Sequence, residues 1–207
     1  GGVEPAFTFV KRALEAGKSV CTSNKALVAA HGAELLAMAK ERSLNFMFEA
    51  SVGGGIPIIR PLNQALTADE ITKITGIMNG TTNYILTKMS NDGSSYEEVL
   101  KEAQALGYAE RNPEADVEGY DACRKIAILT SLADGRTVNF EEITTEGITK
   151  ISNEDFAYAK SSLEILVIPS VVISSKLTVL PSAKEVRIAI FLQASYPSTS
   201  ASGFLSA

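Results

Sequence analysis

Apolar residues are spaced like one face of a helix near the start of the chain. Phe7, Val10 and Leu14 share such a face and predict a helix over Ala6–Ala16, which Pro5 opens and Gly17 closes. A second long helix is predicted over Ala26–Lys40, which is rich in Ala and Leu. Further along the chain, the pattern predicts helices over Thr81–Met89, Tyr96–Leu106 and Tyr120–Leu132.

Short apolar runs between these helices predict strands. Ser19–Thr22 and Asn45–Glu49 flank the second helix, and strand, helix and strand within about 45 residues favour a parallel α/β unit. A further strand is predicted over Glu70–Met78. In residues 161–207, β-branched runs such as Val171–Ile173 and Ile188–Ile190 alternate with serine-rich breaks, which predicts strands in a mixed or antiparallel sheet.

Three consecutive glycines, Gly53 to Gly55, mark the predicted domain boundary. No G-x-G-x-x-G motif occurs in the 207 residues, so a dinucleotide-binding sheet here would lack its phosphate-binding first half. We interpret the chain as α/β: residues 1–50 are the end of a Rossmann-type nucleotide-binding domain. Residues 51–207 are predicted to form an α+β domain with a mixed sheet; its assignment to catalysis, substrate binding and dimerisation is implied by the family resemblance that the motifs of the chain carry.

Composition narrows the class of protein. With 45% hydrophobic and 21% charged residues, the chain can bury a large core, which excludes a disordered, collagenous or coiled-coil protein. The formal net charge of −5, with 19 scattered basic residues, argues against a nucleic-acid or anionic-membrane surface. A small or neutral partner is expected instead.

The sequence also predicts the cellular location of the protein and the state of its two cysteines. No apolar run approaches the roughly 18 residues of a membrane helix, and the first residues do not resemble a signal peptide, so we expect a cytoplasmic protein. Cys21 and Cys123 are predicted to be small buried hydrophobes rather than a disulfide. Together with His31 they supply too few ligands for zinc.

The most polar segment runs from Gly107 to Lys125 and joins two predicted helices. Asp116 or Glu118 in it can cap the following helix. Asp121 and Lys125 are four residues apart on one helix face, which is typical of an exposed ion pair, yet the apolar stripe lies only about 100° away. Lys125 therefore borders the core, where a lysine beside carboxylates can protonate the oxygen of an aldehyde during its reduction. The carboxylates can hold a substrate ammonium group.

Two other segments carry candidate chemistry. Lys25 follows a predicted strand, at the edge where open α/β sheets bind ligands, although a surface lysine is equally compatible with that position. The segment Asn79–Asn83 lies between a strand and a helix, and is either a capped turn or a set of donors for a carboxylate or phosphate. His31 is interpreted as a structural histidine.

Four motifs in order resemble homoserine dehydrogenases: residues 22–29 (TSNKALVA), 48–59 (FEASVGGGIPII), 76–86 (GIMNGTTNYIL) and the run 107–125. The resemblance spans Gly1 to about Lys160. It implies NAD- or NADP-dependent interconversion of aspartate 4-semialdehyde and homoserine, on the route to threonine and methionine, by a homodimer.

The resemblance also implies residue roles. Lys125 matches the proton-donating lysine, and Lys25 a lysine near the nicotinamide and substrate. The residues that match carboxylates binding the substrate's amino group are Glu110, Asp116 and Asp121. Those that match cofactor-binding residues are Gly1, Lys25, Gly107 and Gly203. A monovalent cation, sodium, is implied at the glycine-rich loop, with Glu49, Val52, Gly54 and Ile56 at the matching positions; oxygen ligands suit such a hard cation.

Two alternatives remain at this stage. The chain on its own can be a non-catalytic substrate-binding or dimerisation module, with its exposed sheet pairing with a second copy. It can also be another amino-acid dehydrogenase on the same scaffold.

Overall fold

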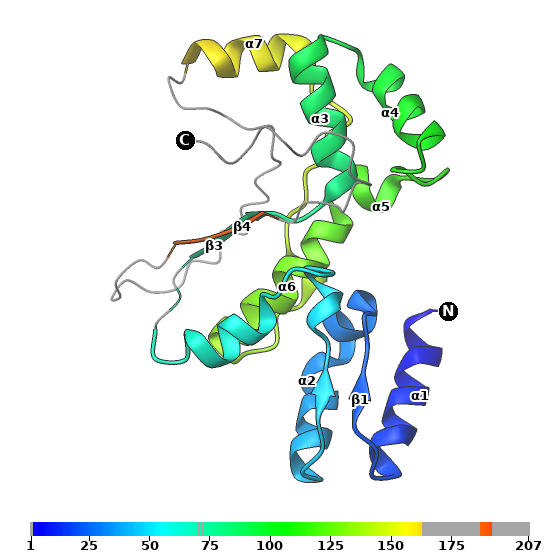
Figure 1. Ribbon diagram of the computed structural model, residues 1–207, viewed down its shortest axis with the longest axis vertical. Coiled ribbons are helices and arrows are strands. Elements are labelled where there is room, and N and C mark those ends of the chain that lie inside the picture. The colour runs from blue at the N-terminus through cyan, green and yellow to red at the C-terminus, as the bar shows by residue number, and fades with distance from the viewer. Residues whose placement is uncertain (1, 70, 72, 163–186, 192–207) are drawn as a thin grey trace.

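The computed structural model describes residues 2–69, 71, 73–162 and 187–191. Its helices fall into two groups (Figure 1). Helices α1 (Val3–Glu15) and α2 (Lys25–Glu41) lie at one end of the molecule, and α3 (Gly80–Asp92), α4 (Tyr96–Ala105) and α7 (Asn153–Ser162) lie at the other. Helix α6 (Tyr120–Asp134) runs between the two groups.

The first helical pair forms where the apolar pattern predicts it. Val10 and Leu14 of α1 are buried in one core with Leu27, Val28 and Leu35 of α2. Gly17 takes a left-handed conformation (φ 73°) after the end of α1, as the sequence predicts. Asn24 caps α2, because its side chain accepts a hydrogen bond from the Leu27 backbone N–H at 3.1 Å.

A short parallel strand pair confirms the predicted strand–helix–strand unit. Strand β1 (Val20–Cys21) pairs in parallel with β2 (Phe46–Met47), and α2 makes the crossover between them. Both strands are shorter than predicted, since Glu49 already belongs to the 3-10 turn η1 (Glu49–Ser51). The prediction that Cys21 is buried is wrong: alternate residues of a strand face opposite sides, and the Cys21 side is exposed. Cys123 is buried as predicted, and both cysteines are free thiols.

A second parallel pair lies beyond the π-helical turn η2 (Pro61–Ala65). Strand β3 (Lys73–Ile77) pairs with β4 (Arg187–Phe191), with Ile74 opposite Ile188. The mixed or antiparallel sheet predicted for the final segment concerned strands that pair with their neighbours in sequence, and apart from β4 and the end of α7 that segment lies outside the described residues. The strands β3 and β4 are separated by all the helices from α3 to α7, and a parallel pair requires a long crossover of this kind. The strand predicted over Val171–Ile173 lies outside the described residues.

The helices of the second group begin and end close to their predicted bounds. Ser95 and Glu98 form a capping box at the start of α4, and Gly135 ends α6 in a left-handed conformation. Two further helices, α5 (Glu114–Val117) and α7, were not predicted. Helix α5 has only four residues, which is too short to show an apolar period. The 3-10 turn η3 (Phe140–Glu142) follows α6.

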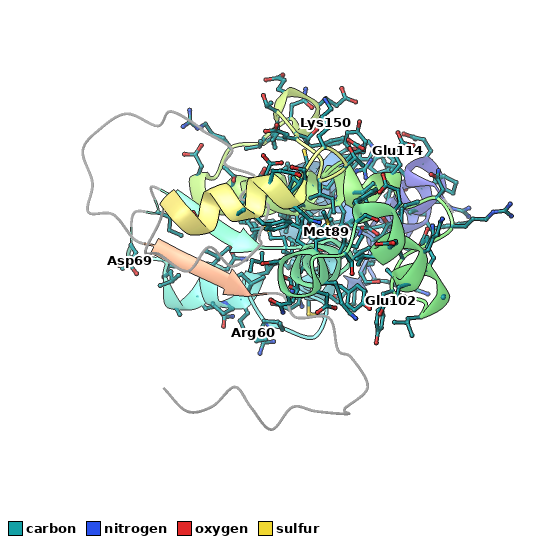
Figure 2. All side chains as sticks on the ribbon, turned by 90° about the horizontal axis from the view of Figure 1, so that it is seen from above. Arg60, Asp69, Met89, Glu102, Glu114 and Lys150 are labelled. Atoms are coloured by element: carbon teal, nitrogen blue, oxygen red, sulfur yellow. The ribbon has the colours of Figure 1, made fainter. Side chains whose placement is uncertain are left out.

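The buried apolar residues of the described part of the chain form two hydrophobic cores. The larger core contains residues of α1, α2, β2 and η2 and is completed by Ile126, Ile128 and Leu129 of α6. The smaller core joins α3, α4 and α5 and includes Ile148 from the segment after η3. Met89 lies within the smaller core, whereas Arg60, Glu114 and Lys150 point outward (Figure 2). The larger core takes residues from both sides of position 50, and the division of the chain into domains there stays a prediction.

The segment after η3 is held closely against α5. The Ile148 N–H donates to the Val117 carbonyl at 2.8 Å, and the Ile148 side chain is 1% exposed. A Cβ atom on Gly147 would lie 2.7 Å from the same carbonyl oxygen, so this close approach requires glycine. None of the described helices is long and apolar enough to cross a membrane.

Candidate active site

The first turn of α2 places Lys25 at the carboxyl end of β1. The lysine follows the capping residue Asn24, and Thr22 Oγ1 accepts a hydrogen bond from the Asn24 N–H at 3.1 Å. Two successive polar caps therefore fix the backbone that carries Lys25. Its Nζ donates to Asp121 Oδ1, an ion pair between residues 96 positions apart. The Lys25 side chain is 42% exposed, so it stands at the surface and at the same time pairs with a buried carboxylate.

Asp121 and Lys125 lie on the inward face of α6. Lys125 Nζ is 2.7 Å from Asp121 Oδ2 and also donates to the Met78 carbonyl at 2.7 Å. Asp121 is only 3% exposed, so this i,i+4 pair is not the solvated pair that such spacing usually gives. A lysine ammonium has three protons, and these two acceptors use two of them. Among the described residues no partner takes the third, which leaves one donor for a bound molecule.

Electrostatics keeps the buried Asp121 carboxyl charged. Burial alone raises its pKa, but Lys125, Lys25 and the amide of Asn79 favour the carboxylate, and together they hold the pKa of Asp121 below its ordinary value. The site thus contains a permanent negative charge between two ammonium groups at neutral pH.

The segment between β3 and α3 adds a neutral polar residue to this cluster. Asn79 Nδ2 donates to Asp116 Oδ1 at 2.7 Å and to Asp121 Oδ2 at 3.0 Å. Its Oδ1 accepts from the Thr82 N–H at 2.8 Å, which caps α3. Thr81 Oγ1 lies 3.3 Å from Asp116 Oδ2 and 2.9 Å from the Tyr108 carbonyl oxygen. The capped-turn interpretation of this segment is therefore confirmed. The donors bond to aspartates of the chain itself, and their use for a ligand's carboxylate or phosphate stays a prediction.

Sequence reasoning did not single out Asn79 itself. Its signal was the polar run Asn79–Asn83 between a strand and a helix, and only the fold brings this run against the carboxylates. The idea that Asp116 or Glu118 caps α6 is wrong, because Gly119 occupies that position and no side chain caps the helix. His31 lies away from the cluster, stacked on Phe7 with ring centroids 4.2 Å apart.

Glu110 and Gly107 lie on the loop next to this cluster. The loop is anchored through Tyr108, whose carbonyl accepts from Thr81, and through Gln104 Nε2, which is 3.1 Å from the Glu110 carbonyl. The Glu110 side chain is exposed, and no hydrogen bond or ion pair of the described residues joins its carboxylate to the cluster. Gly107 has φ 77° and open space at its Cα, so a flat ligand can approach its backbone closely.

Two other predicted cofactor residues, Gly1 and Gly203, lie outside the described residues. Lys25 stands at the carboxyl side of the parallel pair β1–β2, the edge at which open α/β sheets bind ligands. Gly107 belongs to the loop after α4, and its role toward a cofactor stays a prediction.

In the glycine-rich loop, one predicted cation ligand is a side chain and three are backbone carbonyls. The Glu49 carboxylate is already used, since it accepts hydrogen bonds from the N–H groups of residues 58, 59 and 60 at 2.5, 2.7 and 2.9 Å. In the described part of the chain, no donor bonds to the carbonyls of Val52, Gly54 or Ile56. No group of three or more acidic, histidine or cysteine side chains able to hold a metal occurs among the described residues.

A separate cavity of about 310 Å³ lies between α2 and α6. Its lining includes Val28, Leu36, Phe48 and Leu132, and none of the charged residues of the cluster. The site is therefore built around the ion pairs and not around this cavity.

Comparison with known proteins identifies the family to which this chain belongs. Residues 57–192 match the family model described as homoserine dehydrogenase. The chain belongs to the homoserine dehydrogenase family. It is 53% identical over 160 residues to the homoserine dehydrogenase of Bacillus subtilis, covering 77% of this chain and 37% of that protein. It is 50% identical over 159 residues to the enzyme of Mycobacterium tuberculosis, covering 77% of this chain and 36% of that protein.

Solved structures of homoserine dehydrogenases are similar to this chain in fold as well as in sequence. A homoserine dehydrogenase from Thiobacillus denitrificans superposes with a TM-score of 0.75 at 48% identity, covering 78% of this chain and 38% of that one. A hyperthermophilic archaeal homoserine dehydrogenase in complex with NADPH gives a TM-score of 0.66 at 34% identity, covering 74% of this chain and 47% of that one. The chain thus spans less than half the length of each of these relatives.

Proposed function

We propose that the protein containing this chain is a homoserine dehydrogenase, which interconverts aspartate 4-semialdehyde and homoserine with NAD or NADP on the route to threonine and methionine. The observation that carries the proposal is the cluster of Lys25, Asp121 and Lys125. Family membership supports it, as does the NADPH complex of the archaeal relative. Two free thiols and the small substrate favour the cytoplasm.

Each residue of the cluster has a task in this reaction. The cofactor, when bound, supplies the hydride for the aldehyde carbon or receives it from homoserine. Lys125 gives a proton to the aldehyde oxygen as that oxygen gains negative charge, and takes the proton back in the reverse direction. The third N–H of Lys125 is the donor for this step. Asp121 keeps Lys125 oriented, since it accepts from Nζ at 2.7 Å.

The remaining predicted residues bind rather than react. Asp116 and Glu110 bind the substrate's ammonium group, because carboxylates form charge-assisted hydrogen bonds with it. Lys25 and Gly107 contact the nicotinamide end of the cofactor, Gly1 and Gly203 complete that site, and the carbonyls of the loop with Glu49, Val52, Gly54 and Ile56 bind sodium. The second domain pairs two copies of the chain into a homodimer.

The decisive test is substitution of Lys125 in the complete protein. Lys125→Ala should lower kcat for homoserine oxidation by about 10²- to 10⁴-fold, because the group that accepts the hydroxyl proton in this direction is lost. Nicotinamide absorbance measures the rate. Lys101→Ala, which removes an exposed lysine on α4, serves as the control and should leave kcat unchanged. Near-wild-type turnover of Lys125→Ala would overturn this role.

A ligand titration separates an enzyme from a binding module. NADPH binding and homoserine oxidation by the complete protein support the dehydrogenase. Binding of homoserine without any turnover would instead indicate the non-catalytic module, and turnover of aspartate but not homoserine would indicate a different amino-acid dehydrogenase.

A further inference from the structure

Asn79 makes more contacts with the charged cluster than a helix cap needs. It is 7% exposed, and all its side-chain partners come from α3, α5 and α6. One end of the amide bonds to Asp116 and Asp121, and the other caps α3. Asn79 is thus the neutral residue that links both carboxylates to the same helix end.

The orientation of this amide follows from its partners. Both partners of Nδ2 are carboxylate oxygens, which only accept, and both partners of Oδ1, the Thr82 N–H and Thr82 Oγ1, can donate. The flipped amide would set its oxygen against two negative charges, so this arrangement is fixed by charge. An asparagine amide has two protons on nitrogen, and each one serves one carboxylate.

We propose that Asn79 is a positioning residue for the reaction. Its amide fixes the positions of the Asp116 and Asp121 carboxylates relative to each other, and Asp121 in turn fixes Lys125, the proton donor. The proposal rests on the proposed dehydrogenase function. Lys125 is held at two points, Asp121 Oδ2 and the Met78 carbonyl. Asn79 acts on the contact with Asp121, because its amide bonds to the same carboxylate oxygen as Lys125. It also lies next in the chain to Met78, whose carbonyl makes the other contact with Lys125.

Capping and positioning make different predictions for Asn79→Asp and Asn79→Ser. Asp and Ser are both good helix caps, so a residue that only caps α3 tolerates either change. Neither side chain can donate to two carboxylates, and aspartate adds a third negative charge beside Asp116 and Asp121. A positioning residue therefore gives a graded series in which aspartate is a worse replacement than serine, although the two cap a helix about equally well.

The kinetic experiment measures kcat, KM and the pH dependence of kcat/KM for homoserine oxidation in the complete protein. We expect a drop in kcat/KM of about tenfold for Asn79→Ser and at least about a hundredfold for Asn79→Asp. The acidic limb of the pH profile for Asn79→Asp should move to higher pH, because the added negative charge raises the pKa of Asp121, although Lys25 and Lys125 face the same carboxylate. Asn139→Asp is the matched control. Asn139 also caps a helix and donates to an acid, Glu142, but is exposed, so this change should leave kcat/KM and the pH profile unchanged.

A second measurement does not depend on turnover. The carboxyl carbon of Asp121 can be titrated by NMR in wild type and in Asn79→Ser, and the pKa should rise in the variant because a donor to the carboxylate is lost. An unchanged Asp121 pKa, or equal activity of Asn79→Asp, Asn79→Ser and wild type, overturns the positioning role. Inactivity of the wild-type protein toward homoserine overturns the proposed function instead, and the NMR titration still decides the role of Asn79.

Discussion

At the scale of single residues, the site depends on the charge of one buried carboxylate. Asp121 is compensated on both oxygens, and its pKa lies below the ordinary value because the two lysines and Asn79 outweigh the cost of burial. A carboxyl whose pKa is lowered by folding stabilises the native state only while it is ionised. The stabilisation that Asp121 contributes is complete at pH values above the ordinary pKa of the unfolded chain. It is lost as the pH falls through the lowered pKa of the native state.

This argument predicts how stability depends on pH. Asp121→Asn should lower the free energy of unfolding by about 2–3 kcal/mol at pH 7, because two ammonium groups lose their shared partner while Lys25 keeps some solvent. The difference from wild type should shrink as pH falls from about 5 to about 2. Urea denaturation at several pH values measures both effects.

Asp69→Asn is the control for this experiment, because Asp69 is exposed and lies at the periphery of the molecule (Figure 2). It should change the free energy of unfolding by less than about 0.5 kcal/mol at every pH. A constant difference between wild type and Asp121→Asn down to low pH would contradict the charge argument.

Residue patterns predicted part of the site. The i,i+4 spacing identified the pair of Asp121 and Lys125, since both lie on one helix. The bond from Lys25 to Asp121 and the two donations of Asn79 join elements far apart in the chain, and no local pattern encodes such contacts. Family resemblance gave Lys25 a place near the substrate, but not its partner.

At the scale of elements, the long helices are set by apolar faces and by caps. Leu14 is fully buried, whereas Phe9 on the same helix is 70% exposed. The helices were predicted to within a few residues because their periodic faces and end signals are local. The strands were overestimated in length: β1 and β2 have two residues each, against four and five predicted, because an apolar run does not show where the strand pairing ends.

The contrast on α1 gives a stability test. Leu14→Ala should lower the free energy of unfolding by about 3 kcal/mol, since it leaves a cavity between α1 and α2. Phe9→Ala, on the exposed face of the same helix, should cost less than about 0.5 kcal/mol. Chemical denaturation compares the two variants with wild type. Equal losses would mean that α1 does not pack through its predicted face.

At the scale of the whole molecule, the charged cluster lies where the two cores meet. Lys25 comes from an element of the larger core, Asn79 begins α3 of the smaller core, and α6 carries Asp121 between them (Figure 1). The sequence predicted a boundary near the glycine-rich loop, but it could not indicate that α6 contributes to the larger core from more than 60 positions away, since that contact is tertiary.

The proposed homodimer belongs to this scale. Among the described residues β3 and β4 form a two-stranded sheet, and the half-buried Thr75 and Ile77 lie on one face of β3. If the chain forms the proposed dimer through this sheet, a second copy covers that face. Sedimentation should therefore give about twice the 22.0 kDa mass of the chain. Ile77→Lys should shift the equilibrium toward monomer at low micromolar concentration, and a wild type that stays monomeric at high concentration would contradict the dimer.

The ion pair between Lys25 and Asp121 also has a consequence for folding. Its partners are 96 positions apart, so a large chain loop must close before it forms, whereas the helices and their caps need only neighbouring residues. We therefore expect secondary structure to appear first in a refolding chain and the charged pair only when the two cores dock. During synthesis Lys25 emerges from the ribosome long before its partner, and the reactive centre is assembled last.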